Sequence, residues 1–203
     1  MRDPLNVKEI SEVCPDFLGF IFYSGSPRYV GEKPDRSLFR NVPSEITGVG
    51  VFVNEESDKV VDIAKHAGIE MIQLHGNESP VYCQKLRSSG LKIIKAFSIP
   101  KYFEFEVLRS YLACCDYFLF DTKTGNHGGS GRKFNWEILA GYSLDKSFFI
   151  SGGIGPDDAR LIKTFKSKGL FGADINSRFE NTSGIKNVSL VKTFIDAIKN
   201  DQI

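Results

Sequence analysis

The sequence lacks several features that would assign it to common protein classes. No apolar run approaches the roughly 20 residues that span a bilayer, and the start MRDPLNVKEI has no signal-peptide pattern. Neither sign of charge dominates, since 26 basic and 25 acidic residues are spread along the chain. We therefore predict a cytoplasmic protein with a small-molecule partner and no nucleic-acid or membrane partner.

Cysteine is scarce and is not spaced for metal binding. Cys14, Cys83, Cys114 and Cys115 include no CxxC pair, and no histidine stands beside them at ligand spacing. Each lies in or beside an apolar or helical stretch, which is typical of a small buried side chain. This spacing predicts neither a disulfide framework nor a metal site.

Short runs rich in β-branched or aromatic residues recur along the chain. Most are continuously apolar, which is typical of strands covered on both faces. Seven such strands are predicted: FLGFIFY (17–23), GVGVFV (48–53), MIQLHG (71–76), KIIKAF (92–97), YFLFD (117–121), SFFISGG (147–153) and GADIN (172–176).

Helical patterns with recognisable ends separate these strands. Proline follows Asp3 and Ser79 at a first helical position, and VSLVKTFIDAIKN forms an amphipathic last helix. Strand starts about 20 to 30 residues apart favour a parallel sheet of strand-helix units. A doubly wound sheet is the alternative, but no GxGxxG follows the first run. We predict an α/β fold, a single phosphate-binding (β/α)8 TIM-barrel domain over residues 1–203, with seven strands visible and the first strand missing.

Strand ends of a barrel meet at one mouth, so the residues there are site candidates. Gly152 and Gly153 favour phosphate binding, because backbone N–H groups approach an anion closely where no Cβ intrudes; a simple tight turn is the alternative. The other candidates are Arg28, Gln73, His75, Asp121, Ser151, Asp174, Asn176 and Ser177.

Asp121 closes an apolar strand and precedes a loop that contains four glycines. Partial desolvation there is expected to raise its pKa towards that of a general acid, and a helix cap is the alternative. Arg28 has two possible roles. Its guanidinium either binds a carboxylate or phosphate with two hydrogen bonds, or it is a solvated surface charge. His75 is interpreted as a hydrogen-bonded wall of the mouth, and Lys95 as a supporting residue.

Several motifs together resemble phosphoribosylanthranilate isomerase: GFIFY with SPRYV, GVGVFVN, IQLHGNES, FDTKTG with GGSGRKFNW, ISGGI and DINSRFE. The resemblance implies an enzyme of tryptophan biosynthesis that catalyses, without cofactor or metal, the Amadori rearrangement of N-(5-phosphoribosyl)anthranilate to 1-(2-carboxyphenylamino)-1-deoxyribulose 5-phosphate. It implies Asp121 as the general acid and Arg28 as the ligand of the anthranilate carboxylate. It places the phosphate against Gly129, Ser130, Gly131, Gly152, Gly153, Asn176 and Ser177.

The sequence departs from this family in two places. Asn176 and Arg178 stand where serine and glycine are usual, so Arg178 either adds charge near the phosphate or points away. Family members begin with a KICG-type strand whose cysteine is the general base, and this sequence starts just after it. Cys14, at the end of the first predicted helix, cannot replace that cysteine. We therefore expect impaired catalysis, hypothesise a late start site, and expect a monomer or homodimer.

Two other interpretations stay open. The chain could be a different sugar-phosphate barrel enzyme, such as indole-glycerol-phosphate synthase or a pentose-phosphate epimerase, although no catalytic lysine-glutamate set or metal-binding histidine pair is evident. It could also be a non-catalytic, scaffolding phosphate-binding barrel, which the missing base would suit. The presence of Arg28, Asp121 and both glycine segments argues against the second interpretation.

Overall fold

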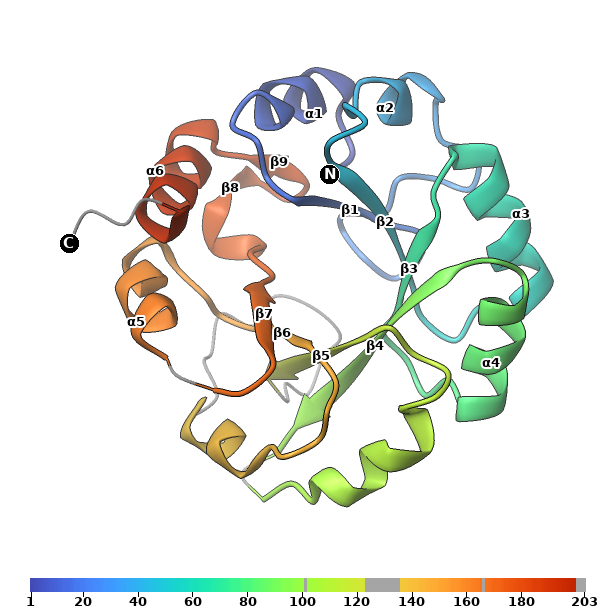
Figure 1. Ribbon diagram of the computed structural model, residues 1–203. Coiled ribbons are helices and arrows are strands. Elements are labelled where there is room, and N and C mark those ends of the chain that lie inside the picture. The colour runs from blue at the N-terminus through green and yellow to red at the C-terminus, as the bar shows by residue number, and fades with distance from the viewer. Residues whose placement is uncertain (101, 123–135, 166, 200–203) are drawn as a thin grey trace.

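The computed structural model describes the chain apart from residues 101, 123–135, 166 and 200–203. A parallel sheet of seven strands curls around its centre in the order β1 to β7, and helices lie outside it (Figure 1). This confirms the predicted α/β class and the seven predicted strands. The strands are β1 (Phe17–Ile21), β2 (Thr47–Phe52), β3 (Met71–Leu74), β4 (Lys92–Ile99), β5 (Tyr117–Thr122), β6 (Phe148–Ile150) and β7 (Leu170–Ala173).

Helices connect the strands and cover the outer face of the sheet (Figure 1). The α-helices are α1 (Pro4–Ser11), α2 (Ser37–Arg40), α3 (Ser57–Ala67), α4 (Pro80–Ser88), α5 (Ala159–Thr164) and α6 (Val188–Lys199). Short 3-10 helices are η1 (Phe105–Tyr111), η2 (Trp136–Gly141), η3 (Pro156–Asp158) and η4 (Ser177–Phe179). Within the described residues, none of the helices has the length and apolar character needed to cross a membrane.

The predicted helix ends rest on local hydrogen bonds. An oxygen of Asp3 accepts the Asn6 N–H at 2.8 Å and caps α1, and the Ser79 hydroxyl accepts the Tyr82 N–H at 3.2 Å and caps α4. Gly68 follows α3 in the left-handed conformation at φ 67°, which glycine adopts without a Cβ clash. These ends depend only on neighbouring residues, which is why the sequence predicts them.

Strand side chains alternate between two apolar layers. One layer packs between the sheet and the helices and includes Phe118 and Phe120 of β5. The other is a small cluster on the inner face that includes Ile94, Leu119 and Phe149. The inner side chains line a cavity of about 1300 Å³ that reaches the carboxyl ends of the strands. On β2 this alternation places every second residue, Thr47, Val49 and Val51, at the cavity.

The last strand differs from its predicted position. The sequence pattern predicts it over residues 172–176, but β7 spans Leu170–Ala173, so Asp174 and Asn176 lie in the loop beyond the strand. Pairing decides this shift, because Leu170 aligns with Phe148 and Ala173 with Ile150 of β6, across a register irregularity. In the described part of the chain, β1 and β7 are the sheet edges and do not pair with each other.

A short hairpin follows β7 and η4. It consists of β8 (Glu180–Thr182) and β9 (Ile185–Lys186), paired antiparallel. The Asn6 side chain of α1 donates to the Lys186 carbonyl at 3.0 Å and accepts the Lys186 N–H at 2.7 Å. These bonds fix the hairpin against α1 and bring its side chains to the edge of the sheet.

Candidate active site

Most of the predicted site residues converge on the mouth of the sheet. The residues at and just beyond the carboxyl ends of the strands form one end of the lining of the central cavity. The predicted residues that line it are Gln73, His75, Asp121, Ser151, Gly152, Gly153, Asp174, Asn176 and Ser177. The predicted residues Gly129, Ser130 and Gly131 lie outside the described part of the chain.

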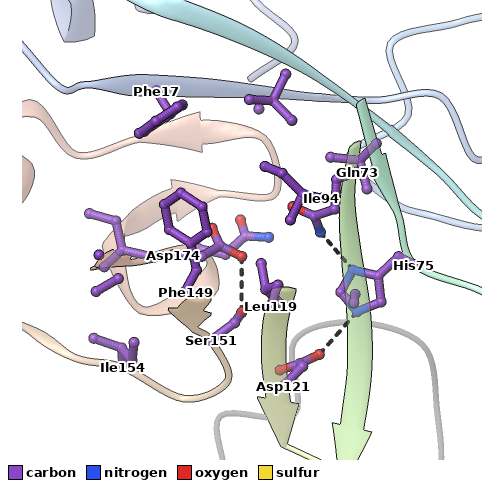
Figure 2. A pocket seen from close by; sticks show the side chains of 18 of the residues that line it. Phe17, Gln73, His75, Ile94, Leu119, Asp121, Phe149, Ser151, Ile154 and Asp174 are labelled. Atoms are coloured by element: carbon purple, nitrogen blue, oxygen red, sulfur yellow. Dashed lines mark hydrogen bonds and ion pairs between the residues drawn. The ribbon is translucent and has the colours of Figure 1, made fainter. Parts of the chain in front are cut away.

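A hydrogen-bonded row of three side chains crosses β3 and β5 (Figure 2). The Gln73 amide nitrogen lies 2.8 Å from Nδ1 of His75, and Nε2 of His75 lies 3.2 Å from Oδ2 of Asp121. With Gln73 as donor to Nδ1, a neutral His75 carries its proton on Nε2 and donates it to Asp121. His75 is thus the wall residue that the sequence predicts, and it orients the Asp121 carboxylate. The Asp121 side chain keeps 22% of its surface exposed at the mouth.

A second carboxyl group faces the cavity from the loop after β7. The Ser151 hydroxyl, at the end of β6, donates to Oδ2 of Asp174 at 2.9 Å (Figure 2). Desolvation by burial raises the pKa of Asp174, the hydrogen bond from Ser151 opposes that rise, and the charge of Asp121 adds to it. The two carboxyls therefore sit in different environments, and Asp174 holds a proton more readily than an ordinary aspartate.

The loop after β6 presents backbone groups to the mouth. Gly152 and Gly153 have φ angles of 91° and 67°, which residues with a Cβ rarely adopt. Nη1 of Arg178 lies 3.4 Å from the Gly153 carbonyl oxygen, so this guanidinium lies against the glycine turn. That Arg178 adds charge near a bound phosphate stays a prediction.

Arg28 is engaged by a carboxylate of the chain itself. Its Nε and Nη2 lie 2.9 and 2.7 Å from the oxygens of Glu180, whose Oε1 also accepts from Lys186 at 3.1 Å. Burial by itself would raise the Glu180 pKa, but the hydrogen bond from Arg28 and the charge of Lys186 outweigh it and lower that pKa to about 2. Arg28 is buried, not a solvated surface charge, and it does not line the cavity.

The comparisons with known proteins agree with this geometry. Residues 1–197 match the family model described as N-(5'phosphoribosyl)anthranilate (PRA) isomerase. The chain belongs to this isomerase family. The family is one of enzymes of tryptophan biosynthesis, so the resemblance predicted from the sequence motifs is confirmed. Among the alternatives, a different sugar-phosphate barrel family is excluded.

Relatives of this isomerase family match nearly the whole chain. The N-(5'-phosphoribosyl)anthranilate isomerase of Phocaeicola vulgatus is 41% identical over 98% of this chain and 95% of its own length. That of Parabacteroides distasonis is 40% identical over 98% of this chain and 90% of its own length. Both comparisons extend across all the strands that carry the candidate site.

Solved structures of phosphoribosylanthranilate isomerases have the same fold. The enzyme from Thermotoga maritima superposes with a TM-score of 0.86 at 31% identity, over 98% of this chain and 95% of that one. A second isomerase structure, solved with reduced 1-(o-carboxyphenylamino)-1-deoxyribulose 5-phosphate, has a TM-score of 0.84 at 28% identity, over the same 98% and 95%. The seven described strands therefore form a TIM-barrel sheet of the isomerase family.

Two buried charges of this isomerase fold were not predicted as site residues. Glu180 and Lys186 lie on the hairpin β8–β9 and face Arg28. The signal that was available is the TSG turn between them, in which Gly184 has a φ of 86°, so that the two residues fall on paired strands. Lys95 is the predicted supporting residue: its ammonium donates to the carbonyls of Leu74 and Gly76 and pairs with Glu78 at 3.1 Å.

Proposed function

We propose that this chain carries the catalytic site for the Amadori rearrangement of N-(5-phosphoribosyl)anthranilate to 1-(2-carboxyphenylamino)-1-deoxyribulose 5-phosphate. One observation carries the proposal. The Asp121 carboxyl stands at the end of β5, held by His75 at 3.2 Å, at the mouth of a cavity of about 1300 Å³. The cavity also extends to the amino ends of the strands, at Pro15, Glu45 and Thr47, so the proposed substrate site is only the part at the carboxyl ends.

Asp121 is the general acid in this proposal. Its carboxyl delivers a proton to the ribose ring oxygen, the bond from C1 to that oxygen breaks, and the nitrogen lone pair forms a Schiff base at C1. Loss of the C2 proton to a base moves the electron pair into the C1–C2 bond and gives an enolamine, which tautomerises to the ketone. Atoms and charge balance, so the chain's residues need only bind the substrate and move protons.

The binding roles follow the positions of the mouth residues. We assign the phosphate to the backbone around Gly152, Gly153, Asn176 and Ser177, with Gly129, Ser130 and Gly131 as further proposed ligands. Arg178 adds positive charge beside the Gly153 turn, which favours an anion there. Gln73, His75 and Asp174 are assigned to the sugar hydroxyl groups. Arg28 is assigned to the anthranilate carboxylate from the family resemblance alone, because it does not line the cavity and its guanidinium already binds Glu180.

The general base of the proposed reaction is not identified among the described residues that line the cavity. The family resemblance implies a cysteine on a KICG-type strand, and none of Cys14, Cys83, Cys114 and Cys115 lines the cavity. Cys14, expected to be buried, is exposed instead. We therefore propose that the 203-residue chain binds the substrate but isomerises it slowly. We further propose a cytoplasmic single-domain protein that is a monomer or homodimer. It acts on a small molecule without metal or cofactor. One related solved structure is of monomers generated from a dimeric isomerase of Thermotoga maritima.

The loss of phosphoribosylanthranilate fluorescence tests the proposal. Three proteins are compared: the 203-residue chain, the same chain with a KICG-type strand added before Met1, and that extended chain with Asp121→Asn. We expect the extended chain to be the fastest by about 10²–10⁴-fold, which is the contribution of a positioned proton-transfer group. Asp121→Asn should remove a factor of the same order.

Each alternative result has a definite meaning. An extended chain that is folded, by circular dichroism, and still inactive would overturn the isomerase assignment and favour a non-catalytic phosphate-binding barrel. An extended Asp121→Asn protein with full activity would overturn the role of Asp121 alone. Equal rates with and without the added strand would show that the base lies within residues 1–203.

A further inference from the structure

Three of the four cysteines meet at one point away from the mouth. The Sγ atoms of Cys83, Cys114 and Cys115 all lie within 4.8 Å of one another, and we call this group the thiol cluster. Cys83 lies near the start of α4, and Cys114 and Cys115 lie in the segment between η1 and β5. None of these residues lines the mouth cavity, so the thiol cluster is separate from the candidate active site.

Backbone and side-chain hydrogen bonds hold the thiol cluster from both sides. The Tyr111 carbonyl accepts the N–H groups of Cys114 and Cys115 at 3.2 and 3.1 Å, and the Tyr111 hydroxyl donates to the Glu78 carbonyl at 3.1 Å. The ammonium of Lys146 donates to the Cys115 carbonyl at 2.7 Å. The three sulfurs are therefore positioned by the fold before any ligand arrives, which reduces the ordering cost of binding.

The thiol cluster is closed to solvent and contains sulfur only. Cys83 and Cys115 have 0% of their surface exposed and Cys114 has 3%. Among the described residues, no histidine, aspartate or glutamate joins this group at ligand distance. An ion at its centre would thus have three sulfur ligands and no water.

We propose that the thiol cluster binds one copper(I) ion through the three sulfur atoms. A metal–sulfur bond of about 2.3 Å in a trigonal arrangement separates the sulfurs by about 4 Å. The Sγ atoms of Cys114 and Cys115 are already 3.9 Å apart. Soft thiolate ligands select soft ions, and structural zinc takes four ligands where this site offers three. Copper(I), which accepts three thiolates, matches the number and the softness of the donors.

Cys83 is the fourth residue of α4, close to the helix end whose dipole stabilises a negative charge. Copper(I) replaces protons on the sulfurs and these protons leave to solvent, so no electron is transferred.

Chelator competition measures the proposed binding. The full chain, reduced and kept without oxygen, is mixed with the coloured bicinchoninate complex of copper(I), and the loss of colour reports transfer of the ion. We expect one ion per chain, and X-ray absorption should show three sulfur neighbours at about 2.3 Å. Cys83→Ser should weaken binding by at least about 10-fold, since it removes a ligand.

The exposed Cys14 supplies the matched control. Cys14→Ser should bind one ion as tightly as the unsubstituted chain, and circular dichroism checks that each variant is folded. The proposal is overturned by no transfer to the unsubstituted chain, by full binding in folded Cys83→Ser, or by displacement of copper(I) by an equal amount of zinc(II). Should Cys83→Ser fail to fold, X-ray absorption on the unsubstituted chain decides, and nitrogen or oxygen neighbours would overturn it.

Discussion

Arg28 and Glu180 are 152 residues apart in the sequence and form a forked ion pair beside the mouth. Oε2 of Glu180 lies 2.7 Å from Nη2 of Arg28, and the two side chains are only 4% and 10% exposed. Arg28 follows β1 and Glu180 follows β7, so the pair joins the two edges of the sheet, which no strand of the described residues connects. A single carboxylate therefore serves both the stability of the sheet and the placement of the predicted carboxylate-binding arginine.

Removing the charge of Glu180 is expected to destabilise the chain strongly. Glu180→Gln leaves the buried Arg28 and Lys186 without their shared counterion, and breaking a buried ion pair costs about 3–5 kcal/mol of unfolding free energy. Urea denaturation measures the change. The matched control is Asp196→Asn, which removes the exposed pair with Lys192 and should change the unfolding free energy by no more than about 1 kcal/mol. Equal losses in the two variants would contradict a special role for the buried pair.

The same pair predicts how stability depends on pH. The pKa of Glu180 is lowered from an ordinary value of 4.5 to about 2. A carboxyl with a lowered pKa in the folded state stabilises the fold above its unfolded pKa, and this contribution is lost as pH falls through the folded pKa. The stability advantage of the unsubstituted chain over Glu180→Gln should therefore shrink between about pH 4.5 and 2.

Urea denaturation of both proteins across this pH range gives the test. Asp174 has a raised pKa and acts in the opposite direction, but it is present in both proteins and its contribution cancels in the difference. An advantage that stays constant down to about pH 2 would show that Glu180 keeps no lowered pKa in the folded chain.

Ser151→Ala is expected to raise the pKa of Asp174 further. Burial raises that pKa and the Ser151 hydrogen bond, at 2.9 Å, opposes the rise, so removing the hydroxyl removes the opposing contribution. A pH titration of the Asp174 carboxyl carbon by nuclear magnetic resonance measures the shift. Ser177→Ala, at the same mouth, should leave the titration unchanged. A lower pKa in Ser151→Ala would contradict the hydrogen-bond direction.

Alanine variants of Gly153 and Gly68 distinguish an effect on substrate binding from an effect of backbone strain. Both have a φ of 67°, so alanine at either position should cost about 1–2 kcal/mol of unfolding free energy. Gly153 lines the mouth and Gly68 ends α3 away from it. Steady-state kinetics of the strand-extended chain should show a raised KM for Gly153→Ala and an unchanged KM for Gly68→Ala. A shared KM change would assign the effect to strain and not to the phosphate site.

Local features of the sequence predicted most of the framework. Continuous apolar runs indicated the seven strands, and the prolines after Asp3 and Ser79 indicated the starts of α1 and α4. The strand ends in turn predicted that Gln73, His75 and Asp121 share one mouth. These predictions succeed because helix caps and strand periodicity are set by residues a few positions apart.

Features that depend on contacts between distant segments were not predicted correctly from the sequence. The bounds of β7 depend on its register with β6, so the sequence alone placed the start of this strand two residues too late and its end three residues too late. Cys14 was expected to be buried and is exposed, in a left-handed conformation at φ 52° just beyond α1. Burial depends on what the rest of the chain packs against a residue, which local composition does not report.

The sequence by itself determined the class of fold, the family and the row of polar residues at the strand ends. The tertiary structure decided which charges meet: Glu180 with Arg28, and Ser151 with Asp174. It also decided that Cys83 joins the pair Cys114 and Cys115, because one face of α4 packs over the segment before β5. Ion pairs and thiol contacts act over a few ångströms in space, and only the folded chain brings such distant residues within that range.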